Sequence, residues 1–87
     1  MKDHAELVAG LRSGKKDAFD AAYRRYRARI YSFLVRLSRN DSIAEDLLQD
    51  TFVRLAKHSP RLAEDTRLDA WLFTVARNLY VSHRPSE

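Results

Sequence analysis

The sequence predicts an all-α fold, a compact bundle of one short and three longer helices in one small domain. Long segments repeat apolar residues at helical spacing, and no segment alternates apolar and polar residues as a half-buried strand would. The two glycines and two prolines fall between these segments or near their ends. A chain of 87 residues buries roughly 60–65% of the surface that it exposes when unfolded, so the expected core is thin.

The first expected helix is short and the second is long. Residues 3–12 form the first, with Leu7, Val8 and Leu11 facing inward, and Ser13-Gly14 ends it. Residues 16–39 form the second, and its other faces are mostly arginine. Its apolar stripe keeps helical spacing throughout and consists of Phe19, Tyr23, Tyr26, Ile30, Phe33, Leu34 and Leu37.

The third expected helix begins at a capping-box pattern. Ser42 is followed three residues later by Glu45, a spacing at which each side chain satisfies a free backbone N–H of the first turn. The helix then runs to about Lys57, and residues 58–65 form a loop because Pro60 cannot continue it. The expected buried stripe is Ala44, Leu47, Leu48, Thr51, Phe52 and Leu55.

The fourth expected helix spans residues 67–83. Thr66 and Asp69 match a second capping box, and Pro85 follows the helix. Its inward stripe is Leu68, Trp71, Leu72, Val75, Ala76 and Leu79. Helices that each have one buried stripe pack as a bundle.

Charge is segregated along the chain, whose net charge is +4. Residues 15–39 contain eight basic and two acidic residues, a net charge of +6, whereas residues 40–56 contain four acidic residues and one arginine, a net charge of −3. A basic surface suggests a polyanionic partner, and a separate acidic patch suggests a different one. The alternative is a solvated surface with no partner at all.

Several function classes lack support in the sequence. There is no cysteine, so neither a disulfide framework nor a thiolate metal site is expected. His4, His58 and His83 lack metal-ligand spacing, and no nucleophile triad, glycine-rich phosphate loop or carboxylate pair is present. We therefore expect no enzyme activity, metal or cofactor. We expect a cytoplasmic protein without membrane insertion, because no signal peptide or apolar run of about 20 residues occurs.

One line of the fourth helix carries aromatic and basic residues opposite its core stripe. Phe73, Arg77, Tyr80 and Arg84 follow one another at spacings of four, three and four, flanked by Thr74, Asn78 and Val81. Rings stack on bases and arginine neutralises phosphate, so this pattern favours single-stranded or melting nucleic acid. In the alternative, Phe73 and Tyr80 pack under a neighbouring helix.

The third helix has an acidic outer side with an apolar residue in its centre. Asp46, Gln49, Asp50 and Lys57 surround Val53. An apolar anchor within a polar ring is typical of a protein interface, and the carboxylates favour a basic partner helix. The alternative is a single exposed valine without a role.

Three segments in this order, DAFDAAYRRYRARIYSFLVRL, AEDLLQDTFVRL and LDAWLFTVARNL, resemble region 2 of an extracytoplasmic-function (ECF) sigma factor of bacterial RNA polymerase. The resemblance covers nearly the whole chain, from the first helix to about His83. It implies that the third helix docks on the clamp helices of the largest core polymerase subunit. The contacts that it implies are Asp46, Leu47, Gln49, Asp50, Val53 and Arg54.

The resemblance also implies that the loop of residues 60–67 and the last helix capture the non-template strand of the promoter minus-ten element. The loop would hold a flipped-out base, and the basic second helix would attract phosphates non-specifically. The DNA-binding residues that follow are Arg61, Leu62, Arg67, Phe73, Thr74, Arg77, Asn78, Tyr80, Val81 and Arg84. An anti-sigma factor that covers these surfaces is a further implied partner.

The expected organisation is one region 2 domain at residues 1–83 and the start of an interdomain linker at residues 84–87. The family's second domain, which recognises the minus-thirty-five element, is absent, and we expect a truncated chain in preference to a one-domain protein. Two other classes stay open. One is a helical adaptor that binds only proteins, and the other is a helix-turn-helix regulator that binds duplex DNA, against which the eight-residue loop before the fourth helix argues.

Overall fold

The computed structural model describes residues 4–83, and all of its regular elements are helical. They are α1 (His4–Arg12), α2 (Lys16–Ser38), α3 (Asp41–His58), the short 3₁₀ helix η1 (Ser59–Arg61) and α4 (Leu68–His83). The predicted all-α class is confirmed, with one short and three longer α-helices. The proposed start of the first helix at Asp3 lies outside the described residues.

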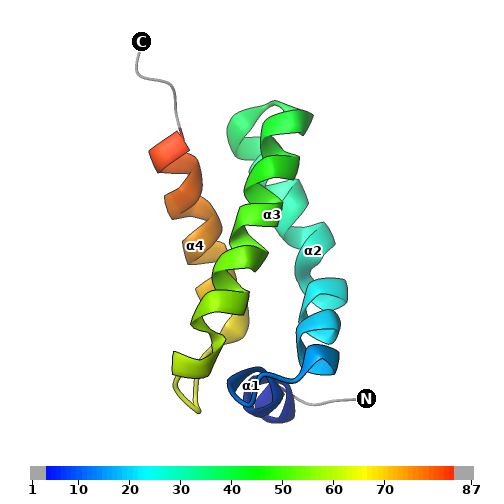
Figure 1. Ribbon diagram of the computed structural model, residues 1–87. Helices are drawn as coiled ribbons and strands as arrows, with labels where there is room; N and C mark the ends of the chain where they lie inside the picture. The colour runs from blue at the N-terminus through cyan, green and yellow to red at the C-terminus, as the bar shows by residue number, and fades with distance from the viewer. Residues whose placement is uncertain (1–3, 84–87) are drawn as a thin grey trace.

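The three long helices pack side by side, and α3 contacts both α2 and α4 (Figure 1). The chain runs up α2, down α3 and up α4, so α2 and α4 run in the same direction and also touch each other. The short α1 lies across the lower end, where it packs on α2 and on η1. This arrangement leaves one side of α3 and one side of α4 facing solvent.

The core follows the predicted stripes closely in α1 and α3. All three predicted residues of α1 and all six of α3 are buried. In α2, however, the smallest residues of the inner face, Ala18 and Ala22, are fully buried and were not predicted. The predicted Phe19 and Tyr23 are only half-buried. Small side chains let neighbouring helices approach closely, which leaves the larger rings at the rim of the contact.

The predicted capping box at the start of α3 is wrong. The cap is Asn40, whose side-chain Oδ1 accepts a hydrogen bond of 2.9 Å from the backbone N–H of Ile43. Asn40 has extended backbone angles, as an N-cap requires, and Ser42 already lies in the first turn. Asn and Ser are both favoured at this position, and the choice between them depends on where the chain turns after α2. It turns at Arg39, which has the left-handed φ of 57°.

The connection from α3 to α4 also differs from the prediction. α3 continues to His58, and η1 occupies part of the expected loop. The Thr66 hydroxyl donates to the carbonyl oxygen of Ala63 at 2.6 Å, and α4 begins two residues later, at Leu68. The N–H of Leu68 is instead bonded, at 3.2 Å, to Nε2 of His4 in α1.

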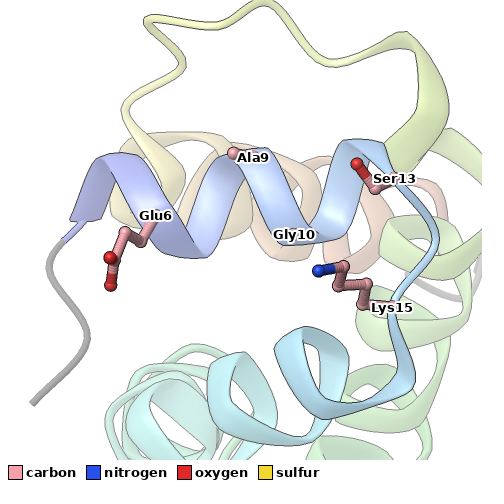
Figure 2. Close-up of a pocket in the computed structure, with 5 residues that line it drawn as sticks. All are labelled: Glu6, Ala9, Gly10, Ser13 and Lys15. Atoms are coloured by element: carbon pink, nitrogen blue, oxygen red, sulfur yellow. The ribbon is translucent and has the colours of Figure 1, made fainter.

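A glycine allows α1 to cross closely over α2. A Cβ atom built on Gly10 would lie 2.7 Å from the Cβ of Ala18, far inside normal contact distance. Figure 2 shows Gly10 on the side of α1 that faces the start of α2, with Lys15 in the connection below it. The backbone N–H of Lys15 bonds to the carbonyl oxygen of Gly10 at 3.0 Å, which fixes the turn.

We predict that Gly10→Ala lowers the free energy of unfolding by about 1–2 kcal/mol. Overpacking costs about 1–3 kcal/mol, which exceeds the gain of up to about 1 kcal/mol from replacing a helical glycine. Urea unfolding measures the change. The Ala18→Gly substitution removes the opposing methyl group, so the double variant should lose less stability than the two single losses combined. Additive losses would contradict the close approach.

We predict that Asn40→Ala lowers the free energy of unfolding by about 1 kcal/mol, because the N–H of Ile43 loses its cap. Ser42→Ala serves as the matched control, since Ser42 is exposed in the first turn and should change stability by less than about 0.5 kcal/mol. Thermal unfolding of both variants compares them directly. A larger loss in Ser42→Ala would restore the capping box and refute the Asn40 cap.

Candidate functional site

The outward side of α3 exposes three polar side chains around one apolar side chain. Asp46, Gln49 and Asp50 are exposed, and Val53 keeps 49% of its surface accessible. Within residues 4–83, neither Asp46 nor Asp50 forms an ion pair. Their charges are therefore available to a partner, and Val53 offers that partner an apolar contact.

The other two residues predicted for this surface lie at different depths. Leu47 is only 2% exposed and belongs to the core, where its carbonyl oxygen accepts a bond of 2.8 Å from the Thr51 hydroxyl. Arg54 is exposed on the side of α3 that faces α4. Leu47 thus supports the surface from behind, whereas Arg54 lies at its border.

An apolar hollow between α2 and α3 extends the surface beyond Val53. Its lining includes Phe19 and Tyr23 of α2 together with Phe52, Val53 and Ala56 of α3. The Phe52 ring fixes both α2 rings edge-on, with centroid distances of 6.2 Å to Phe19 and 5.0 Å to Tyr23. The apolar stripe of α2 predicts that both rings lie in the core. The pattern of α2 alone does not indicate that they also border the acidic side of α3.

The acidic start of α3 influences a tyrosine on α2. Partial burial raises the pKa of the Tyr31 hydroxyl, and the negative charges of Asp41 and Glu45 raise it further. The negative potential of α3 thus reaches across to the neighbouring helix.

The connection before α4 is held against the rest of the domain. Leu62 is 4% exposed and anchors the segment in the core, whereas Arg61 and Arg67 on either side of it are exposed. An ion pair of 3.6 Å joins Glu64 to Arg12 of α1, and His4 bonds to Leu68. Two predicted site residues, Arg61 and Arg67, are therefore presented to solvent by a segment that is fixed at several points.

The predicted aromatic line on α4 is wrong in one respect, because its rings are not freely exposed. Phe73 is half-buried and packs edge-on against Phe33 of α2, with ring centroids 5.1 Å apart. Tyr80 is also half-buried against the core. For Phe73 this is the alternative in which the ring packs against a neighbouring helix, whereas Tyr80 packs against the core, and both rings keep part of their surface exposed. The buried residues of α4 cover only one side of the helix, and Phe73 beside them also contacts α2.

The polar part of the predicted α4 surface is exposed. Thr74, Arg77, Asn78 and Val81 all face solvent, and Val81 is 49% exposed. Asn78 lines a shallow hollow together with Arg54 of α3, so the α3 and α4 surfaces meet there. Arg84 lies outside the described residues.

The hollow between α1 and the start of α2 does not have the features of a ligand site. It is lined by Glu6, Ala9, Gly10, Ser13 and Lys15, and Figure 2 shows that the side chains of Glu6 and Ser13 point in different directions. Within residues 4–83, no three His, Cys, Asp or Glu side chains cluster as metal ligands would. Among the helices of that same segment, none has the length and hydropathy needed to cross a bilayer.

Residues 22–86, about three quarters of the chain, match the sigma-70 region 2 family. The chain therefore belongs to this family. No solved structure matches it.

Its relatives identify the chain more narrowly as an ECF-type region 2. It is 42% identical over 68 residues to RNA polymerase sigma factor CarQ of Myxococcus xanthus, covering 78% of this chain and 39% of that protein. It is 36% identical to ECF RNA polymerase sigma factor SigM of Bacillus subtilis, covering 74% of this chain and 39% of the relative. For ECF RNA polymerase sigma factor SigL of Mycobacterium tuberculosis the identity is 32%, covering 91% and 45%. The chain thus spans about two fifths of the length of these relatives.

Proposed function

We propose that this chain attaches a transcription initiation factor to core RNA polymerase through the outward side of α3. We further propose that it captures the non-template strand of the minus-ten element with residues 61–67 and α4. The single observation that carries the proposal is the division of α3 into a buried inner side, apolar except for Thr51, and an acidic outer side centred on Val53. Family membership supports it, since residues 22–86 include both surfaces.

The composition of the α3 surface favours a basic helical partner. Asp46 and Asp50 lie four residues apart and so on the same side of the helix, each without an ion pair among residues 4–83. Val53 and the adjoining rings of Phe19 and Tyr23 provide an apolar centre that a partner can desolvate. The clamp helices of the largest polymerase subunit are the partner that the sigma-factor family implies.

The segment before α4 suits the capture of an unpaired base because it is fixed before DNA arrives. Flipping a base out of a duplex costs a few kcal/mol, so a protein cannot also bear a large ordering cost on binding. Leu62 and the contacts of Glu64 and Leu68 with α1 hold this segment, and Arg61 and Arg67 are free to meet phosphates. The exposed Thr74 and Arg77 continue the same surface along α4.

Both surfaces are open to a regulator. An anti-sigma factor that covered the acidic side of α3 and the exposed side of α4 would block attachment and strand capture together. This part of the proposal rests on family membership alone. We further propose that the protein acts with the polymerase in the cytoplasm.

The polymerase surface is tested by titrating the domain with the isolated clamp helices. We predict that the parent protein binds and that Asp46→Lys/Asp50→Lys reduces the affinity at least tenfold, because two attractive charges become repulsive. A control variant, Asp17→Lys/Asp65→Lys, makes the same charge change at exposed positions on other elements. It should bind nearly as well as the parent. Equal loss in both variants, with both folded by circular dichroism, would refute a specific α3 interface.

Strand capture predicts a preference for single-stranded over duplex DNA. At low salt, the domain should bind an oligonucleotide of the non-template strand more tightly than the same sequence as a duplex. Arg67→Gln with Arg77→Gln should reduce this preference, since both side chains lie on the proposed surface. Fluorescence anisotropy measures both affinities. A preference for duplex would favour a helix-turn-helix regulator, and binding of neither DNA with intact polymerase binding would favour a protein-only adaptor.

A further inference from the structure

We infer that the groove between α2 and α4 is a seat for the sugar-phosphate backbone of the captured strand, with Arg29 and Arg36 as its phosphate ligands. The inference rests on the proposed function and adds a site on a helix that is otherwise expected to attract DNA only diffusely. It predicts that α2 takes part in strand binding through one defined row of residues.

The row follows one line of α2 on the side nearest α4. Arg25, Arg29, Ser32 and Arg36 succeed one another at spacings of four, three and four, so they lie above one another on the helix. Arg29, Ser32 and Arg36 line a shallow hollow together with Ala28 and with Phe73 of α4. The small side chains of Ala28 and Ser32 leave space between the two guanidinium groups.

Aromatic rings hold Arg29, one of the two arginines of this groove, and Arg25, one turn before it. The Cζ atom of Arg29 lies 5.8 Å from the ring centroid of Phe73 and 5.8 Å from that of Tyr26. The Cζ atom of Arg25 lies 5.6 Å from the Tyr26 centroid. Stacking of this kind restrains an arginine without using its N–H donors. Arg25 and Arg29 are therefore positioned in advance, and their N–H donors stay available, whereas Arg36 is placed by its position in the same row.

No carboxylate neutralises these arginines within the described residues 4–83. The ion pairs found there join Arg12 to Glu64 and Lys16 to Asp20, both away from the groove. Each unneutralised guanidinium group presents a planar fork of N–H donors that matches phosphate oxygens. The groove therefore favours an anion with several phosphates or carboxylates in a row.

The neighbourhood of the groove favours nucleic acid over an acidic protein segment. Phe73, which lines the groove, belongs to the same helix as Thr74 and Arg77 of the proposed strand surface. The sugar-phosphate backbone of a strand bound to that surface would therefore run along the groove. Aromatic and arginine side chains side by side also suit successive nucleotides, which offer a phosphate and a planar base in turn.

The other arginines of α2 provide a matched control. Arg24 and Arg27 are exposed on α2 but do not line the groove, and the Cζ atom of Arg27 lies 5.5 Å from the Tyr23 ring centroid. Each pair therefore contains one arginine that stacks on an aromatic ring, Arg29 in the groove pair and Arg27 in the control pair. Glutamine retains part of the side-chain stem and removes the charge. Arg29→Gln/Arg36→Gln and Arg24→Gln/Arg27→Gln therefore differ mainly in location.

The experiment measures the salt dependence of binding to a labelled single-stranded oligonucleotide by fluorescence anisotropy, with folding checked by circular dichroism. For single strands the slope of log affinity against log salt is about −0.7 for each phosphate contact. The groove variant should therefore lose about 1.4 from the magnitude of the slope, because it loses two contacts. The control variant should keep a slope close to that of the parent.

Each other outcome contradicts the groove. Equal reductions in both variants would show diffuse attraction by the whole of α2. An unchanged slope in the groove variant, with binding still reduced by Arg67→Gln/Arg77→Gln, would leave the proposed function intact and place the backbone elsewhere. Displacement of the strand by poly-glutamate at equal charge concentration, as efficient as by unlabelled DNA, would assign the groove to acidic proteins. Failure of the parent to bind any strand would refute the groove, while the clamp-helix titration still tests the α3 surface.

Discussion

The packing of α3 between α2 and α4 is the constraint on which the other features of this domain depend. A helix that contacts two neighbours must present a wide apolar side, and α3 does so with six buried residues. Helical geometry then leaves one remaining side, where Asp46, Gln49, Asp50 and Val53 are exposed. Burying apolar surface contributes about 25 cal/mol per Å², so the inner side is fixed by stability. Residues on the outer side are not needed for the core, so their side chains can suit a binding partner.

The same packing separates the two proposed binding surfaces. Because α4 lies on the other side of α3 from much of α2, its exposed residues Thr74 and Arg77 face a different direction from the apolar hollow beside Val53. The surfaces meet near Arg54 and Asn78. The two proposed surfaces therefore leave room for a protein partner and a DNA strand at the same time. The short α1 contributes by holding the segment before α4 through His4 and Arg12.

The helical periodicity of the sequence was sufficient to predict the fold class and most of the core. Stripes of residues at helical spacing identify the buried sides of α1 and α3 correctly. The sequence did not identify the N-cap of α3, because both Asn40 and Ser42 suit that position. The choice between them depends on the left-handed turn at Arg39. Periodicity also did not show which residues of one helix contact its neighbour, as Phe73 of α4 contacts Phe33 of α2.

The candidate site was predictable only in part, for the same reason. The exposure of Asp46, Gln49, Asp50 and Val53 follows from their position opposite the stripe of α3. The contributions of Phe19 and Tyr23 to the apolar hollow, and of Arg29 to the α4 side, depend on the register between helices. One helix pattern contains no information about that register. The bond from Leu68 to His4, 64 residues apart, is a further contact of this kind.

The most direct test of this account is a nuclear magnetic resonance map of the isotope-labelled domain, recorded with the clamp helices and separately with a single-stranded oligonucleotide. The account predicts two distinct sets of shifted backbone signals. The clamp helices should shift signals of the outer side of α3, around residues 46–53, and the oligonucleotide should shift those of residues 61–67 and the exposed side of α4. Shifts by both ligands on one common surface would contradict the division of α3 and α4 into separate binding surfaces.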